Sequence, residues 1–454
     1  MRLNHKKAVF WKIWQMFTTS AYFHQIEAYE KLKYLKVGAL FADMGTGKTR
    51  IAFELFADKM RRKKVIKVCY ITPFSTMKSV DDEFKKHFIS LPDYIIFAYE
   101  SIQASDRLYL DVLKLVDNST FLIMDESHFI RNDNIKRTAR IYEIAKRCQY
   151  KLIMTGTPIP KNIGNLYSQF KVLDSRILGY KSFDQFASNH LVYRLRDNFV
   201  IASKNIEFVS QRIAPYVYQI KKSECLDLPE KIQYTRIVSM DEGSIDEYQQ
   251  IKEKYFNTIM NEEYVVPGLI FAMFTELQQV CDLSEGKYYD LQDVLQEIKG
   301  KQVIIYFKFL NSLKRTKELL NEKAYEFSGQ LNLHERNNNL QKWIENSSGI
   351  LLITYGTGSF SLNLQSCSDI IYLNQTFDYA QKLQSQDRIH RIGQINSCNY
   401  INIITNAGIE NILEKSENKK YNVIKEFTDK INSIKKEKDK DVRKELQNLW
   451  ERYI

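Results

Sequence analysis

Short apolar runs bounded by small or charged residues recur through the first half of the chain. Runs of about four to eight apolar residues are typical of buried β-strands, and helix-like patterns such as residues 51–56 stand between them. An alternation of buried strands and helices predicts an α/β fold. The runs that we interpret as strands are residues 37–41, 65–71, 94–98, 120–124 and 150–155.

Residues 215–290 show a different pattern, which we interpret as helical. Apolar side chains recur there at helical spacing, at Ile245, Tyr248, Ile251 and Tyr255. The aromatic residues of this segment are expected to be core rather than platforms for nucleobases.

The lysine-rich tail from residue 412 carries nearly as many acids as bases and also has a helical pattern. We expect its helices to pack back on the preceding domain, with a DNA-contacting arm as the alternative. Two apolar stripes support the packing, one at Val423, Phe427, Ile431 and Ile434, the other at Val442, Leu446 and Leu449.

Length and composition indicate a globular protein of more than one domain. At 454 residues, 44% hydrophobic and 27% charged, the chain suits two or three domains of about 150 residues. It contains no apolar run of about 18 residues, and its basic N-terminus is not followed by the pattern of a secretory signal. The six cysteines are scattered without a C-x-x-C pair, which argues against a zinc site or a disulfide framework. We therefore expect a cytoplasmic protein.

The formal net charge is +11 and fits a polyanionic partner such as nucleic acid, although a merely basic protein would show the same excess. One basic run, Arg61 to Lys64, falls where a helix should end. Cations there are favourable for the helix dipole, and we prefer this reading to a DNA-binding patch.

The loop after the first strand has the composition of a phosphate-binding loop. Asp43, Met44, Gly45, Thr46, Gly47, Lys48 and Thr49 follow the apolar run and precede a helical pattern. Backbone N–H groups of such a loop converge on an anion at a helix N-terminus. Lys48 would reach the β- and γ-phosphates of ATP, and Thr49 would bind Mg²⁺ through its hydroxyl. Ala42 stands where the usual pattern begins with glycine.

Two further strand ends carry candidate chemistry. Residues 120–124 lead into adjacent carboxylates, of which Asp125 would hold Mg²⁺ and Glu126 would act as general base toward the attacking water. Residues 150–154 lead into Thr155 and Thr157, whose hydroxyls could sense the γ-phosphate. Upstream, Gln25 offers the donor and acceptor of an amide, which suits the edge of adenine.

These motifs, together with a run in the second half, resemble superfamily two helicases. Gln384-Ser-Gln-Asp-Arg388-Ile-His-Arg391-Ile-Gly-Gln394 looks like the sixth motif of the Swi/Snf-like DNA translocases. Segments similar to other parts of that family are residues 227–231, 284–287, 303–308, 328–329, 351–358 and 362–365. The resemblance covers roughly residues 20–410.

The resemblance implies two RecA-like α/β lobes with ATP bound in the cleft between them. The expected domains are a first lobe over residues 1–214, a helical inter-lobe segment over 215–290, a second lobe over 291–411 and a helical tail over 412–454. Asn374 and Phe377 replace a common Asp and Trp, and Ser361 replaces a usual glycine. We see no accessory module, so the chain is similar to compact motors of bacteria, their viruses or mobile elements.

Site residues are also implied by the resemblance. Arg388 and Arg391 match the arginine fingers, which would neutralise charge on the phosphoryl oxygens in the transition state. Gln384 and Gly358 belong to motifs that border the nucleotide, Gln25 matches the adenine-contacting glutamine, and His128 joins Thr155 and Thr157 as coupling residues. The expected cofactors are ATP and Mg²⁺.

The family binds duplex DNA across both lobes, on the loops that follow the strands. Hydroxyls and backbone N–H groups there suit phosphate contacts without sequence readout. The positions that correspond are Thr72, Pro73, Tyr99, Ser101, Ser328, Gly329, Thr354 and Thr357.

The leading hypothesis from the sequence is an ATP-dependent translocase on double-stranded DNA that remodels DNA or DNA-bound protein. A strand-separating DNA or RNA helicase is the alternative within the same class. An ATP-gated DNA-binding subunit that recruits a nuclease or replication partner is the alternative from another class.

Overall fold

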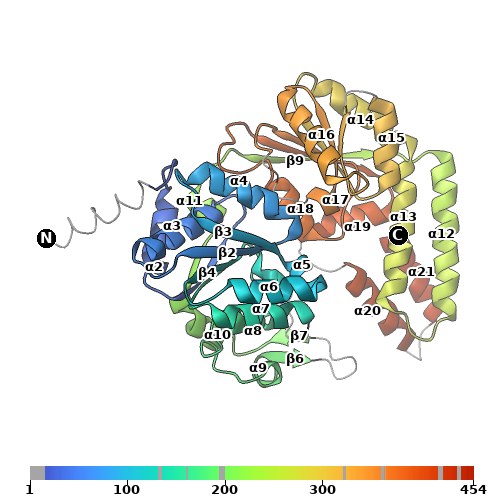
Figure 1. Ribbon diagram of the computed structural model, residues 1–454. Coiled ribbons are helices and arrows are strands. Elements are labelled where there is room, and N and C mark those ends of the chain that lie inside the picture. The colour runs from blue at the N-terminus through green and yellow to red at the C-terminus, as the bar shows by residue number, and fades with distance from the viewer. Residues whose placement is uncertain are drawn as a thin grey trace. The chain divides into compact units, whose positions relative to one another are not determined.

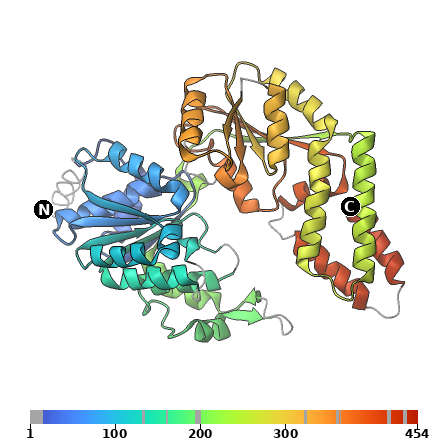
Figure 2. The same cartoon turned by 45° about the vertical axis from the view of Figure 1, so that its right-hand side comes forward.

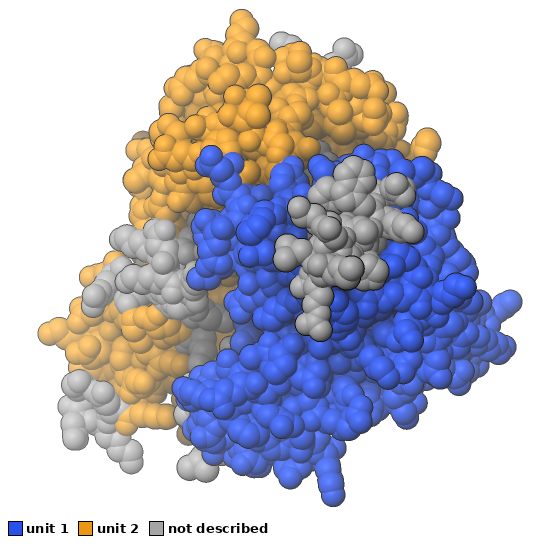
Figure 3. Space-filling model, turned by 90° about the vertical axis from the view of Figure 1, so that its left-hand side faces the viewer, with its two compact units in different colours: residues 1–227 blue, residues 228–454 orange. Residues whose placement is uncertain are grey.

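The computed structural model describes residues 16–130, 135–159, 162–193, 200–320, 324–358, 362, 364–417, 423–436 and 441–454. The chain divides into two compact units, residues 1–227 and 228–454, which Figure 3 colours separately. Within the described residues no helix has the length and apolar character needed to cross a membrane. Ser361 lies outside these residues.

Unit 1 is built around a parallel sheet (Figure 1). Its described strands follow the spatial order β3-β2-β4-β5-β1-β8. They are β1 Val37–Ala42, β2 Lys67–Thr72, β3 Asp93–Ala98, β4 Thr120–Met124, β5 Tyr150–Thr155 and β8 Val217–Ile220. The five apolar runs are all strands, because runs this apolar suit strands that are covered on both faces.

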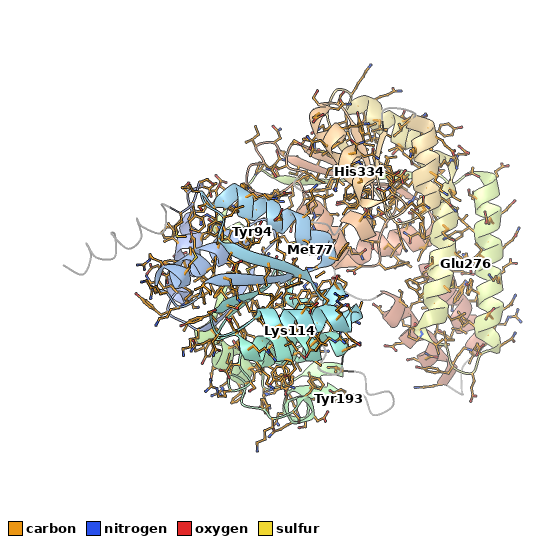
Figure 4. The ribbon with its side chains drawn as sticks, viewed as in Figure 1. Met77, Tyr94, Lys114, Tyr193, Glu276 and His334 are labelled. Atoms are coloured by element: carbon orange, nitrogen blue, oxygen red, sulfur yellow. The ribbon has the colours of Figure 1, made fainter. Side chains whose placement is uncertain are left out.

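Helices cover both faces of this sheet and enclose two hydrophobic cores. One core lies under α2 Phe23–Leu32, α3 Lys48–Arg61 and α4 Met77–His87. Tyr94 of β3, labelled in Figure 4, stacks on Phe84 of α4 with ring centroids 4.1 Å apart. The other core lies under α5 Tyr99–Ala104, α6 Asp106–Leu115, α7 Lys136–Arg147 and α8 Gly164–Leu173.

The rest of unit 1 is a small subdomain and a final turn of helix. The subdomain holds α9 Phe183–His190, the antiparallel strands β6 Leu191–Tyr193 and β7 Val200–Ser203, and α10 Ile206–Ile213. Short α11 Lys222–Cys225 follows β8.

Unit 2 contains a second parallel sheet, whose described strands follow the order β11-β12-β10-β13-β14-β9. The strands are β9 Lys231–Val238, β10 Val303–Phe307, β11 Ala324–Phe327, β12 Ile350–Thr354, β13 Asp369–Tyr372 and β14 Cys398–Thr405. The helices against it are α14 Glu285–Glu297, α15 Leu310–Leu320, α16 Leu333–Glu345, α17 Tyr355–Gly358 and α18 Tyr379–Gln386. The main sheets of the two units are therefore both parallel and flanked by helices, which is the α/β design that the sequence predicted.

A bundle of helices forms a separate core in unit 2, visible beside the sheet in Figure 2. It consists of α12 Glu242–Asn261, α13 Pro267–Leu283, α19 Gly408–Glu417, α20 Val423–Lys436 and α21 Val442–Tyr453. Phe427, Ile431 and Leu446 are buried in it, so the tail helices pack back on the second unit through the stripes expected from the sequence.

The expectation that residues 215–290 are helical is wrong for two segments. Val217–Ile220 is β8, paired with β1, and Lys231–Val238 is β9, paired with β14 along eight residues. Both are edge strands, so one side of each lacks a neighbour and their apolar pattern is weak. Tyr234 and Ile237 of β9 are exposed. The boundary between the compact units falls between these strands, and the four-part domain division stays a prediction.

Candidate nucleotide site and nucleic-acid interface

The loop between β1 and α3 adopts a conformation that its glycines make possible. Gly45 has φ +78° and Gly47 has φ +80°, a left-handed region that disfavours residues with a Cβ. A Cβ on Gly47 would also lie 2.3 Å from Nε2 of Gln25. Gly47 is the N-cap of α3, so Lys48 and Thr49 open the helix with the first N–H groups facing the loop.

The loop is held by hydrogen bonds to its own carbonyl oxygens. Nζ of Lys48 donates to the carbonyl oxygens of Ala42 (2.9 Å) and Asp43 (3.3 Å), and Thr46 Oγ1 donates to that of Asp43 (2.8 Å). The Asp43 carboxylate accepts from the backbone N–H of Lys222 at 2.9 Å, which ties the loop to α11. A lysine bonded to neutral carbonyls can exchange them for phosphate oxygens without breaking an ion pair.

Helix α2 supports the loop from behind through two neighbouring side chains. Gln25 is buried, accepts from Tyr22 N–H at 2.9 Å and donates to the Thr46 carbonyl at 3.3 Å. His24 is also buried, and its Nε2 donates to the same carbonyl at 2.8 Å. The structure thus brings Gln25 to the loop, while its contact with adenine stays a prediction. His24 was missed by the sequence analysis, because a histidine beside Gln25 has no pattern of its own.

The carboxylate pair lies at the carboxyl end of β4. Asp125 donates its N–H to Ile71 of β2 (2.8 Å), and its carboxylate accepts from the hydroxyl of Tyr70 (3.0 Å) and from the N–H of Glu126 (2.9 Å). Glu126 has φ +45°, left-handed backbone that costs a non-glycine residue roughly 1 kcal/mol or more. This backbone turns the Glu126 side chain toward the end of β5.

Glu126, His128 and Thr155 form a triangle of polar contacts. Thr155 Oγ1 donates to Glu126 Oε2 at 3.2 Å and accepts from Thr157 N–H at 3.1 Å. Nδ1 of His128 lies 3.2 Å from Thr155 Oγ1 and 3.3 Å from Glu126 Oε2. The structure therefore brings together the expected base and the coupling residues that follow β4 and β5.

Burial and charge separate the acidities of the two carboxyl groups. Burial and the neighbouring Glu126 charge raise the pKa of Asp125, with Lys48 opposing them. Burial also acts to raise the pKa of Glu126, but the hydrogen bond from His128 and the Lys48 charge outweigh it and lower that pKa. Glu126 thus stays ionised near neutral pH, as a group that polarises water must.

A buried glutamine of α8 joins the loops that follow β4 and β5. Gln169 accepts from Ser127 Oγ at 2.7 Å and donates to the carbonyl oxygens of Pro158 and Asn165, both at 2.9 Å. Ser127 and Gln169 are both fully buried. The sequence analysis missed this link. A polar residue beside the buried Phe170 of the same helix is the signal that could have shown it.

In unit 2 the expected arginine fingers occupy the turn after α18. Burial raises the pKa of Tyr306, and the charge of Arg388, itself buried, acts in the opposite direction. Arg391 is partly exposed and donates to the carbonyl of Leu362 at 3.3 Å. Gln394 stabilises this turn by donating to the Cys367 carbonyl at 2.8 Å. Gln384 lies on α18 and Gly358 is the last residue of α17, so both belong to unit 2. Their approach to a nucleotide stays a prediction.

Comparison with known proteins identifies the family. A model described as the SNF2-related domain matches residues 93–285, and one described as the helicase conserved C-terminal domain matches residues 286–393. The chain belongs to the SNF2-related family of helicases. The phosphate loop and Gln25 precede the matched residues, so their assignment depends on the geometry above.

Curated relatives of this SNF2-related chain come from bacteria and yeast. It is 23% identical to an uncharacterized ATP-dependent helicase of Mycoplasma genitalium, over 86% of this chain and 40% of that protein. It is 24% identical to the SWI/SNF chromatin-remodeling complex subunit snf22 of Schizosaccharomyces pombe, over 78% of this chain and 23% of that protein. The putative ATP-dependent helicase/translocase YwqA of Bacillus subtilis is 23% identical, over 72% of this chain and 37% of that protein. The chain thus spans less than half the length of these relatives.

Among solved structures, the chain is similar to the Sulfolobus solfataricus SWI2/SNF2 ATPase core in complex with dsDNA. The identity is 22%, the TM-score is 0.42, and the match covers 94% of this chain and 97% of that one.

The positions expected to contact DNA follow strands in both units of this SNF2-related chain, but most are not exposed side chains. Ser101, Thr354 and Gly329 are partly or fully accessible. Tyr99 stacks on Phe129 with ring centroids 5.6 Å apart, and Thr357 Oγ1 donates to the Phe327 carbonyl at 2.8 Å. The buried positions are Thr72, Pro73, Tyr99, Ser328 and Thr357. Their role in DNA binding stays a prediction, and it would fall on backbone groups rather than side chains.

Proposed function

We propose that this chain is an ATP-driven motor that moves on double-stranded DNA and remodels DNA or DNA-bound protein. The observation that supports this most is the convergence, at one edge of the unit 1 sheet, of the Lys48 loop, the Asp125–Glu126 pair and the Thr155 hydroxyl. Family membership supports the same conclusion.

The groups of unit 1 fit ATP with Mg²⁺. The left-handed glycines leave the loop N–H groups at the start of α3, where a phosphate is stabilised by the helix N-terminus. Lys48 would exchange its carbonyl partners for phosphate oxygens. Thr49 and Asp125 would hold Mg²⁺, which supplies charge neutralisation for the phosphates.

Glu126 would accept the hydrogen bond of the water that attacks the γ-phosphate and take up its proton as the phosphoryl group leaves ADP. His128 and Thr155 hold the Glu126 carboxylate in position. They thereby connect the general base to the loop after β5. Arg388 and Arg391 would stabilise negative charge on the transferred phosphoryl group, as their match to the family's sixth motif implies. Because they belong to unit 2, hydrolysis would depend on the arrangement of both units, which is what a motor requires.

The test is the steady-state ATPase rate with no nucleic acid, duplex DNA, single-stranded DNA or RNA, with Glu126→Gln as blank. Strong stimulation by duplex DNA is expected, followed by displacement of a protein block without strand separation. Stimulation by single strands or RNA alone would instead indicate an unwinding helicase. DNA binding without stimulation would contradict the motor.

A further inference from the structure

The amino ends of the unit 1 strands carry a basic surface that the nucleotide site does not use. Since β1, β2 and β5 are parallel, Lys36, Ile66 and Tyr150 lie at one edge of the sheet, opposite the loops that follow the strands. Helix α3 starts at the phosphate loop and ends at this other edge. We name the following residues there the amino-edge surface: Tyr34, Lys36, Arg61, Arg62, Lys63 and Lys64.

Contacts join the amino-edge surface into one region. Lys36 accepts a backbone hydrogen bond from Lys151 of β5 at 2.9 Å. The ammonium group of Lys59 reaches the carbonyl of Lys33, and the N–H of Lys64 donates to Lys59 at 2.9 Å. The Arg62 guanidinium lies 5.0 Å from the centre of the Tyr34 ring. The C-terminal ends of α2 and α3, which lie side by side in Figures 1 and 2, therefore bear a continuous set of cations.

The cations of this edge outnumber its acidic residues, of which Asp58 and Asp117 are paired and Asp93, at the start of β3, is exposed. Asp58 is fully buried and pairs with Arg61 (3.2 Å) and Arg62 (2.8 Å). Asp117 pairs with Lys67 at 3.6 Å. Lys36, Lys63 and Lys64 are exposed, and no acidic partner is found for them among the described residues.

The helix dipole accounts for Arg61 and Arg62, which lie at the C-terminal end of α3 and pair with Asp58. It does not account for the remaining lysines. Lys63 has φ +54°, so the chain has already left the helix there. Two large side chains at the same edge, Tyr34 and Ile66, are 69% and 64% exposed. Uncompensated lysines beside an exposed aromatic ring are typical of surfaces that bind nucleic-acid backbones.

We propose that the amino-edge surface is a second binding site for the phosphate backbone of duplex DNA, separate from the DNA path of the motor. This inference depends on the proposed function, because it takes DNA as the polyanion that the chain meets. The positions expected to contact DNA in unit 1 all follow the carboxyl ends of β2 and β3. Strands of six residues separate the two edges by about 20 Å.

The separation determines which DNA can be bound. Duplex DNA is stiff over about 150 base pairs, so a short duplex at the carboxyl edge does not bend round to the amino edge. The second site must therefore take another duplex, or a distant part of a long one. The consequence is that one copy of the chain brings two DNA segments together.

The experiment measures capture of a labelled duplex by an immobilised duplex, each about 50 base pairs long so that neither can bend round the unit. The wild-type chain of residues 1–454 is compared with Lys36→Gln/Lys63→Gln/Lys64→Gln. Loss of three phosphate contacts should lower capture of the labelled duplex at least about ten-fold. The slope of the logarithm of its affinity against the logarithm of the salt concentration should become smaller by about 2.7. Binding of a single duplex and the duplex-stimulated ATPase rate at saturating DNA should stay within about two-fold.

The matched control is Lys181→Gln/Lys204→Gln/Lys221→Gln, which removes the same charge from exposed lysines elsewhere in unit 1. It should capture the second duplex as wild type does. Equal capture by the amino-edge variant and wild type, equal loss in the control, or no capture by wild type would each overturn the proposal. Binding of a polyglutamate chain to the amino-edge surface, without capture of a second duplex, would also overturn the proposal. Failure of the proposed function would appear differently, as an ATPase rate that duplex DNA does not stimulate.

Discussion

Each unit contains a lysine among two carboxylates, and the two clusters behave oppositely. In unit 1, Lys48 bonds to loop carbonyls while Asp125 and Glu126 bond to hydroxyl, backbone and histidine groups. The Glu126 side chain is 18% exposed. In unit 2, Lys287 is completely buried and donates to Asp282 at 2.9 Å, to Glu410 and to the Leu373 carbonyl at 3.1 Å.

The difference is one of pairing and access. The cluster around Lys287 joins α13, α14, α19 and the residue after β13, and its lysine pairs with both carboxylates inside the protein. The cluster around Lys48 has a cation and two carboxylates that do not pair directly and that water can reach. Charges already paired and buried stabilise a fold, whereas charges held apart at a strand end remain available for a ligand.

The largest expected effect tests the cluster around Lys48. Glu126→Gln should lower the ATPase rate by about 10² to 10⁴-fold, because an amide is a poor proton acceptor. The free energy of unfolding should change by less than about 1 kcal/mol, since the carboxylate is partly exposed. Steady-state hydrolysis and denaturant unfolding of the same preparation check both. Hydrolysis at the wild-type rate would remove Glu126 from the role of general base.

For the cluster around Lys287, the main expected effect is on stability. Lys287→Met leaves Asp282 and Glu410 buried without their cation, so unit 2 should lose about 3–5 kcal/mol of stability. Adding Glu410→Gln should restore part of it, because one uncompensated carboxylate is removed. Guanidinium unfolding measures the change, with the exposed Lys299→Met as control. If Lys287→Met unfolds no more easily than Lys299→Met, the cluster does not stabilise unit 2.

A backbone substitution tests how far the phosphate loop depends on its geometry. Gly47→Ala should weaken ATP binding about ten-fold, because a Cβ strains the left-handed backbone by about 1–2 kcal/mol and meets the Gln25 amide. Titration with a fluorescent ATP analogue reports the affinity. Gly268→Ala in α13 is the matched control, since nothing lies within 4 Å of the added Cβ. Equal affinities for the two variants would show that the loop tolerates the change.

The smallest expected effect concerns a single carboxylate outside both clusters. Asp241 caps α12 and accepts from Ser244 N–H (3.0 Å), Ser284 Oγ (2.9 Å) and Glu285 N–H (3.1 Å). Burial acts to raise the pKa of Asp241, but these hydrogen bonds outweigh it and hold the pKa below its usual range. Asp241→Asn should cost about 1 kcal/mol at pH 7.

The sign of the pH dependence follows from that lowered pKa. The stabilisation by Asp241 is complete above the unfolded-state pKa of about 3.9 and is lost as the pH falls further, through the folded-state value. The difference in stability between wild type and Asp241→Asn should therefore shrink from pH 5 to pH 3. A difference that stays constant over this range would show that the charge of Asp241 is not what stabilises the cap.

Much of unit 1 could be predicted from the sequence because its signals are local. The apolar runs, the glycine loop and the carboxylates that follow β4 are each specified within about ten residues. The edge strands β8 and β9 were missed, since an edge strand is defined by its partner, and their partners β1 and β14 lie more than 150 residues away. Gln169 and His24 were missed because their partners, Ser127 and Thr46, lie outside the local pattern, 42 and 22 positions away.

The sequence by itself determined the α/β class, the order of the chemical motifs and the family. Those features depend on the identity and spacing of neighbouring residues. Only the tertiary structure decided that Lys48 is available while Lys287 is not. It also decided that Tyr99 is buried and that Lys36 lies in one surface with Lys63 and Lys64. Burial and pairing are set by residues distant in the chain, such as Lys287 and Glu410, which are 123 positions apart.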